Sequence, residues 1–409
     1  MYIPLPLLLT EVCRTATVGQ RFVHIYARWT RFRGDVGKAV LLLEDGFELA
    51  GESFGARGEA FGEVVFNTSL SGYQEVLTDP SYRGQIVTMT YPLIGNYGIV
   101  PEDGESAGTW LSGFVVREVA RLRSNWRSTT DLSSWLGERG VVGIQCVDTR
   151  ALTRHLRIEG AKHGVVSSAD LDRASLERKL AESPRIVGID LVKEVTCSTA
   201  YEWTEGLPGL RPVGPRRRVV VMDCGVKRNI LRHLVSTGNR VTVVPARTSP
   251  AEILALSPDG LVLSNGPGDP EPVSYVIETV KNLIGTLPIF GICLGQQMLG
   301  LALGGKTYKL KFGHHGGNHP VKDLDTGRIA ITSQNHGFNV DMKSLPGPGT
   351  RTTHVNLYDG TEEGLENIDR RFFSVQYQPE ASPGPHDSGY LFARFAALMD
   401  GRRDRAQKN

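Results

Sequence analysis

Apolar runs alternate with amphipathic segments throughout the carboxyl half of the chain, from residue 218 onward. The apolar runs are rich in Val, Ile and Leu and have no polar face, which is typical of strands buried on both sides. Strands are predicted at 219–223, 240–245, 260–264 and 287–292, and helices at 229–236, 250–256, 273–283 and 294–303. This alternation predicts an α/β fold with a doubly wound, mostly parallel sheet, in which ligands bind beyond the carboxyl ends of the strands.

The amino half has a different pattern. Its short β-rich runs are 40–43, 62–66, 85–89 and 113–116. Asp148 has the chemistry of an N-cap for a helix at 151–157. Because glycines are frequent and periodic helices are few, this half is predicted to be a compact, β-rich α+β amino-terminal domain.

Composition indicates where these parts meet. Gly and Pro recur between residues 206 and 215, which predicts a linker at 199–217 between an amino-terminal domain at 39–198 and the α/β domain at 218–402. Residues 1–38 do not resemble the rest and are predicted to be a disordered extension. Their Arg-rich, acid-poor composition is also typical of an organellar transit peptide.

Charge and cysteine usage narrow the class of protein. The 409 residues carry 46 basic and 44 acidic side chains, a net charge of +2, which argues against nucleic-acid or membrane-surface binding. No apolar run approaches the ~18 residues of a membrane span. The five cysteines are scattered and lack CxxC spacing, so we expect a reducing compartment, the cytoplasm, rather than a disulfide framework.

The most informative motif lies between the predicted strand 287–292 and the helix that follows it. Gly291-Ile292-Cys293-Leu294-Gly295 is typical of the sharp turn that exposes a nucleophile at a sheet edge. A helix amino terminus favours negative charge, so the Cys293 thiol is predicted to be exposed and to have a lowered pKa. The Leu294 N–H is placed to stabilise an oxyanion. The alternative is a buried structural cysteine.

Two further segments are predicted to end at the same sheet edge. The loop after strand 260–264 contains Gly266 and Gly268, whose lack of a side chain lets a ligand approach the backbone closely. Residues 372–380 are predicted to be a strand. Gln378 and Glu380, two apart, then share one face near its end.

In this order the three segments resemble those of the class I glutamine amidotransferases. The resemblance implies a catalytic triad in which Cys293 is the nucleophile and Glu380 orients a histidine base, but the position of that base holds Gln378. A glutamine amide forms hydrogen bonds but cannot carry the proton that the leaving ammonia requires. His336 and His386 are the two histidines that the sequence offers as substitutes, and their distance from Cys293 stays open.

The amino half extends the resemblance to the family of carbamoyl-phosphate synthase small subunits. The motifs are 62–69, 72–82 and 90–96, together with 312–320 and 333–338 in the carboxyl half. The resemblance implies that a group of eight residues binds the substrate glutamine: Ser81, Gly266, Gly268, Leu294, Gln297, Asn335, Gly337 and Phe338.

The resemblance also implies a function and a partner. This chain would hydrolyse L-glutamine and deliver ammonia to a large synthetase subunit, which makes carbamoyl phosphate from bicarbonate and ATP. No cofactor is expected in this chain, because ATP and magnesium belong to the large subunit. One rival hypothesis, favoured by Gln378, is a weak or inactive docking subunit of an ammonia-dependent synthase. An unrelated cysteine hydrolase is another, and the amino-domain motifs argue against it.

Two further motifs suggest other kinds of binding site. His314, His315 and His319 suggest a metal site, but no further ligand stands at the right spacing, so none is predicted. Residues 300–307 match the phosphate-loop pattern. That pattern requires a strand before it and a helix after it, whereas here the predicted helix comes first.

Overall fold

The computed structural model describes residues 37–210 and 217–401. The predicted extension at 1–38 therefore lies almost wholly outside the described residues, as does part of the predicted linker. The described residues from Lys38 onward belong to one compact unit. The predicted division of that unit at residues 198 and 218 stays a prediction.

The amino half is built around a closed barrel of seven strands, in the order β1-β2-β8-β6-β4-β3-β9. The strands are β1 (Lys38–Leu43), β2 (Glu48–Gly55), β3 (Glu59–Asn67), β4 (Gln85–Met89), β6 (Gly113–Val115), β8 (Val142–Gln145) and β9 (Lys162–Ser167). Three neighbouring pairs, β3–β4, β4–β6 and β6–β8, are parallel and the others antiparallel. A separate parallel pair joins β5 (Leu93–Ile94) and β7 (Glu118–Val119).

Alternate side chains of the barrel strands face two different cores. In β1, Leu41 and Leu43 pack inside the barrel, whereas Val40 and Leu42 pack outward. The outward pair is covered by Leu176 and Leu180. The helices of this half are α2 (Tyr73–Thr78), α3 (Leu132–Glu138), α4 (Thr149–Glu159), α5 (Arg173–Glu182) and α6 (Val192–Val195). Asp148 caps α4 by accepting a hydrogen bond from the Ala151 N–H at 2.9 Å.

The carboxyl half contains one ten-stranded sheet, in the order β10-β12-β11-β13-β14-β19-β18-β17-β15-β16. Its strands are β10 (Tyr201–Trp203), β11 (Arg217–Asp223), β12 (Asn239–Pro245), β13 (Gly260–Leu263), β14 (Ile289–Ile292), β15 (Lys306–Asp323), β16 (Ile329–Asp341), β17 (Arg351–Asn356), β18 (Glu362–Asn367) and β19 (Phe372–Val375). The core β12-β11-β13-β14-β19 is parallel, and β18, β17, β15 and β16 extend it in antiparallel fashion. The predicted α/β class is confirmed, with a larger antiparallel extension than the pattern suggested.

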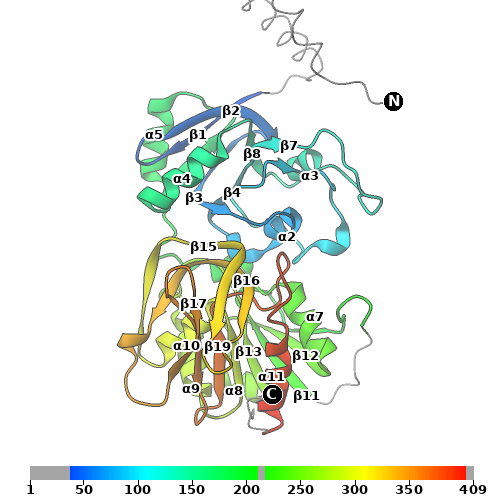
Figure 1. The fold of residues 1–409 in the computed structure, drawn as a ribbon, viewed down its shortest axis with the longest axis vertical. Coiled ribbons are helices and arrows are strands. Elements are labelled where there is room, and N and C mark those ends of the chain that lie inside the picture. Colours follow the sequence, from blue (N-terminus) through cyan, green and yellow to red (C-terminus); the bar gives the residue numbers. More distant parts are fainter. Residues whose placement is uncertain (1–36, 211–216, 402–409) are drawn as a thin grey trace, which may run out of the picture. The chain divides into compact units, whose positions relative to one another are not determined.

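Helices cover both faces of the parallel core (Figure 1). They are α7 (Arg228–Ser236), α8 (Pro250–Ala255), α9 (Ser274–Leu283), α10 (Leu294–Ala302) and α11 (Tyr390–Met399). In β11, Val220 and Met222 join the core under α8, α9 and α10, whereas Val219 and Val221 join the core under α7 and α11. This two-sided burial explains why the parallel strands have no polar face.

Two segments differ from their predicted form. The predicted linker contains β10, which pairs antiparallel with β12 and so adds a strand to the edge of the sheet. The predicted strand at 372–380 ends at Val375. Beyond it the Gln376 N–H bonds to Glu363 and the Gln378 N–H bonds to Ser333, so the backbone has left the β14–β19 ladder before Gln378.

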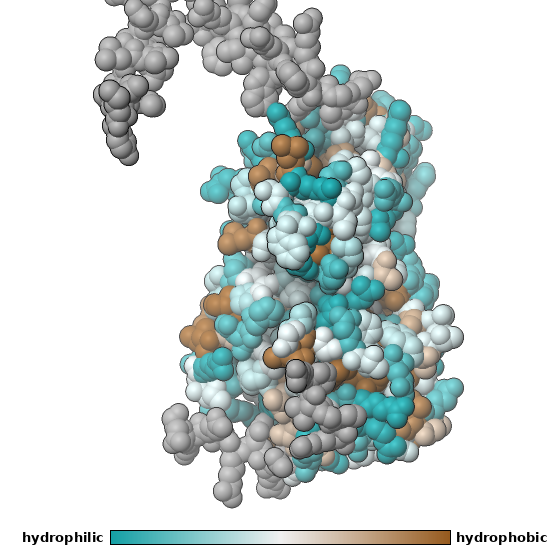
Figure 2. Space-filling view, turned by 90° about the vertical axis from the view of Figure 1, so that its right-hand side faces the viewer, coloured by the Kyte–Doolittle hydropathy of each residue, from teal (hydrophilic) through white to brown (hydrophobic). Residues whose placement is uncertain are grey.

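Exposed apolar side chains are spread over both halves. In the view of Figure 2 they form small groups separated by hydrophilic residues. Trp126 and Leu122 are the most exposed large apolar residues of the described part, at 93% and 84%. The helices in residues 37–210 and 217–401 include none that is long and apolar enough to span a membrane.

Candidate active site

Cys293 lies at a strained turn between β14 and α10. Its backbone has φ 54°, in the left-handed region that non-glycine residues rarely adopt. Both flanking glycines are required, since a Cβ on Gly295 would lie 2.3 Å from the Leu263 carbonyl oxygen and one on Gly291 would lie 2.9 Å from Gly295. The Cys293 N–H is fixed by the Val375 carbonyl at 2.8 Å. The Gly-x-Cys-x-Gly spacing thus encodes a tight strand-to-helix turn.

The thiol itself is buried, with 1% of Cys293 exposed. Its sulfur lies 3.6 Å from the Asn335 carbonyl oxygen and 3.7 Å from Nε2 of Gln376. Burial raises the pKa of Cys293, and the nearby carboxylates of Asp79 and Glu380 raise it further, while the Leu294 N–H opposes them. The prediction of an exposed thiol with a lowered pKa is therefore wrong, because burial and two carboxylates outweigh the helix terminus.

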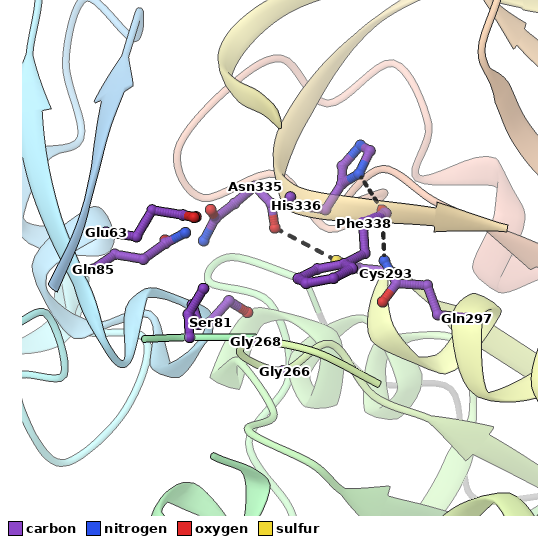
Figure 3. A pocket seen from close by; sticks show the side chains of 12 residues that line it. Glu63, Ser81, Gln85, Gly266, Gly268, Cys293, Gln297, Asn335, His336 and Phe338 are labelled. Carbon is purple, nitrogen blue, oxygen red and sulfur yellow. Dashed lines mark hydrogen bonds between the residues drawn. The ribbon is translucent and has the colours of Figure 1, made fainter. Parts of the chain in front are cut away.

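A pocket beside Cys293 is lined by residues of both halves (Figure 3). Seven of the eight predicted binding residues line it: Ser81, Gly266, Gly268, Gln297, Asn335, Gly337 and Phe338. Leu294 does not, because its side chain packs in the core under α8, α9 and α10. Three residues that the sequence did not suggest also line the pocket: Glu63, Gln85 and Ile186. His336, which the sequence offered as a substitute base, lines it as well.

A chain of polar contacts links the amino half to the glycine loop. Ser81 belongs to the short helix η1 (Pro80–Tyr82), whose N-cap is Asp79. The Ser81 hydroxyl accepts a hydrogen bond from Asn265 Nδ2 at 2.8 Å. Asn265 directly precedes Gly266 in the glycine loop. A Cβ on Gly266 would lie 2.2 Å from the Cys224 carbonyl oxygen, so only glycine fits there. The loop and Ser81 therefore form one wall of the pocket.

Gln378 and Glu380 meet around a buried lysine. Lys227, fully buried, forms an ion pair with Glu380 Oε1 at 2.9 Å and donates to Gln378 Oε1 at 3.3 Å. Gln378 Nε2 in turn donates to Asp79 Oδ2 at 3.3 Å. The Gln378 amide thus bridges a cation and an anion.

Comparisons with known proteins identify the family to which this chain belongs. Residues 41–166 match the family model of the carbamoyl-phosphate synthase small chain, CPSase domain, and residues 220–398 match that of class-I glutamine amidotransferases. The carbamoyl phosphate synthase small chain of Syntrophotalea carbinolica is 59% identical over 372 residues, covering 90% of this chain and 99% of that protein. Those of Rhodopirellula baltica and Chlorobaculum tepidum are each 54% identical, covering 88% of this chain and 96% and 98% of theirs. The chain belongs to the carbamoyl-phosphate synthase small-chain family.

Membership of the small-chain family confirms the resemblance inferred from the motifs. Four side chains that contact the triad positions were missed by the sequence reasoning: Lys227, Asp79, Gln376 and Asn229, whose Nδ2 donates to the Glu380 carbonyl. Lys227 follows β11 at the carboxyl edge of the sheet, where a ligand site is expected, so its position was an available signal. Asp79 and Gln376 offered no such signal, because they reach Gln378 and Cys293 only through the tertiary fold.

Neither of the two substitute histidines is placed as a base for Cys293. His336 Nδ1 donates a hydrogen bond to the Phe338 carbonyl oxygen, and its Nε2 lies beside Gln334 Oε1, both at 2.9 Å. The ring turns away from Cys293 (Figure 3). Burial holds the pKa of His336 well below 6.5, so the ring is neutral. His386 is exposed on the loop before α11, whereas Cys293 is buried.

The buried histidine cluster of this small chain is organised by carboxylates. His314, His336 and Glu363 lie close enough to share a metal ion. However, His314 Nε2 lies 2.7 Å from Asp359 Oδ2 and its Nδ1 lies 3.3 Å from Glu363 Oε1. Both ring nitrogens of His336 are engaged as well. These contacts explain the cluster without a metal ion: the His314 imidazolium lies between two carboxylates. That this site binds no metal stays a prediction.

His314 should make the stability of the small chain depend on pH. Burial alone would lower the pKa of His314, but Asp359 and Glu363 raise it to about 9, above its ordinary value of 6.5. The stabilisation is therefore complete below pH 6.5 and is lost as pH rises through 9. We expect the free energy of unfolding to fall by on the order of 2–3 kcal/mol between pH 6.5 and 9.5.

Urea unfolding across this pH range would measure the slope, with Asp359→Asn as the matched variant. Removing that carboxylate takes away one partner of the imidazolium and should flatten the slope between pH 7 and 9. An equal slope in the two proteins would show that His314 is not the titrating group.

Proposed function

We propose that this chain is the glutamine-hydrolysing subunit of a carbamoyl-phosphate synthase. One observation carries the proposal: Cys293, held at φ 54° on the elbow, faces a pocket walled by the Gly266–Gly268 loop and by residues 335–338. The thiolate would attack the side-chain amide carbon of glutamine. Ammonia would leave from the tetrahedral intermediate as the glutamyl thioester forms, and water would then hydrolyse the thioester to release glutamate and the free thiol.

The binding residues have separate parts in this reaction. The backbone N–H groups of Gly266 and Leu294 would stabilise the oxyanion that forms during attack. Gln297, one turn after Cys293 on α10, is held by the Phe338 carbonyl at 2.8 Å and so fixes the pocket wall. Ser81, Gly268, Asn335, Gly337 and Phe338 would hold the rest of the substrate.

Gln378 sets the rate of this reaction. The thiol has a raised pKa, and the amide at the base position cannot take its proton. These two facts favour a second candidate function, a catalytically weak docking subunit whose partner uses free ammonia. The two candidates share a fold and a partner and differ only in glutamine turnover.

The proposed partner is a large synthetase subunit that binds bicarbonate, ATP and magnesium and receives the ammonia. L-Glutamine is the proposed small-molecule substrate, and the proposed location is the cytoplasm. Nucleic acid and membranes are not proposed as partners. No metal or cofactor is proposed for this chain, because its proposed chemistry uses only a thiol, backbone N–H groups and water.

Reaction with a glutamine-like chloroketone tests the proposal. Cys293 should be alkylated, and L-glutamine should protect it, because the pocket brings the reagent to the sulfur despite the raised pKa of the thiol. A general maleimide lacks this guidance and should modify the exposed Cys146 first. Peptide mass spectrometry would locate both labels, and a Cys293→Ala variant is the control. Equal labelling of Cys224 or Cys146 by the chloroketone, with no protection by glutamine, would remove the assignment of Cys293 as nucleophile.

A further inference from the structure

Two polar side chains of the barrel face the pocket from the side opposite Cys293. Glu63 on β3 and Gln85 on β4 are direct register partners in a parallel pair, so their side chains lie side by side on one face. Both line the pocket, and both are at least nine-tenths buried, at 8% and 4% exposed. Figure 3 shows them entering from the barrel and pointing toward Asn335.

These groups leave hydrogen-bonding capacity unused. The buried Oε1 of Gln85 has no hydrogen-bond partner within residues 37–210 and 217–401, and neither does Nδ2 of Asn335 across the pocket. Glu63 Oε1 forms an ion pair with Lys309 at 2.5 Å. Glu63 Oε2 faces Gly337, since a Cβ built on that glycine would lie 3.8 Å from it. Buried polar atoms without partners cost free energy, so a pocket that keeps several of them is suited to a polar ligand.

We propose that Glu63 and Gln85 form the subsite that receives the α-ammonium group of the substrate. An ammonium group has three donors and no acceptor, and this wall offers two acceptors, Oε2 of Glu63 and Oε1 of Gln85. A substrate whose side-chain amide lies at Cys293 would extend its amino-acid end toward the barrel. The subsite would therefore select an α-amino acid amide over an amide that lacks the amino group.

Lys309 keeps Glu63 in place for this role. Its ammonium lies 4.9 Å from the centre of the Phe338 ring, so it joins the barrel to a wall of the same pocket. The other reading of this ion pair is a purely structural bridge between the barrel and the sheet. The two interpretations predict different effects on the affinities for ligands with and without an amino group.

The inference rests on the proposed function, and ligand selectivity tests it. Dissociation constants of L-glutamine and of glutaramate, which is glutamine without its α-amino group, would be measured by calorimetry on the full chain carrying Cys293→Ala. This background prevents turnover. A charge-assisted hydrogen bond corresponds to about tenfold or more in affinity, so L-glutamine should bind at least that much more tightly.

In the Cys293→Ala background, Glu63→Gln should reduce this preference about tenfold, because it weakens the binding of L-glutamine and not that of glutaramate. Gln85→Met should reduce the preference by a smaller factor. Glu59→Gln is the matched control, because Glu59 lies on the same strand and binds Lys179 at 2.6 Å, away from the pocket. A structural bridge would weaken both ligands alike and leave their ratio unchanged, which would overturn the inference. If the parent protein binds no L-glutamine, the proposed function fails as well.

Discussion

A Gln378→His variant is expected to release ammonia from glutamine faster than the present sequence by about 10²-fold or more. The present amide bridges Lys227 and Asp79 but has no titratable proton. An imidazole at the same position could take the thiol proton and pass it to the leaving nitrogen. The measurement is the steady-state rate of glutamate formation with a large synthetase subunit present.

Two controls make this result specific. Gln378→Asn changes the side chain without adding a base and should stay slow. Ammonium salts bypass the thioester, so carbamoyl phosphate formation from ammonia should be the same in all three proteins. Equal glutamine-dependent rates in the present protein and in Gln378→His would show that another group carries the proton.

The pattern of apolar and polar residues predicted most of the secondary structure, because this pattern reflects which side chains are buried. Strand β4 spans the predicted residues 85–89, and the four predicted parallel strands of the carboxyl half all occur. Strands β13, β14 and β19 and most of β11 are buried on both faces, so their apolar sequences alone indicate their structure. The closed barrel could not be predicted in this way, since closure depends on β1 pairing with β9 across more than a hundred residues.

The chemistry of the site was less predictable than its location. The elbow at Cys293 follows from glycines that are next to it in sequence. The state of the thiol depends instead on Asp79, from the amino half, and on Glu380, from beyond β19. Burial of the thiol is the larger cause of its raised pKa, and both the burial and these charges arise only from the tertiary fold. Together they reversed the predicted direction of the pKa shift.

The buried lysine at the centre of this network explains how the triad region holds its shape without histidine. Three carboxylates, those of Glu380, Asp79 and Glu105, act on Lys227 and keep its pKa raised although burial opposes this. Lys227 also bonds the Ala381 carbonyl, which follows Glu380 directly. The cation therefore offsets several buried negative charges and fixes the segment that carries Gln378.

Replacing Lys227 by methionine should lower the free energy of unfolding by about 3–5 kcal/mol, because it leaves Glu380 buried without its cation. Urea unfolding monitored by tryptophan fluorescence and by circular dichroism would measure the loss. Lys281→Met is the matched control: it removes the same charge from a pair with Glu278 on α9 in which the side chains are 64% and 65% exposed, so its effect should be much smaller. The double variant Lys227→Met, Glu380→Gln should recover part of the loss, since it removes a buried charge together with its partner. Equal losses for Lys227→Met and Lys281→Met would show that the buried pair does not hold this region together.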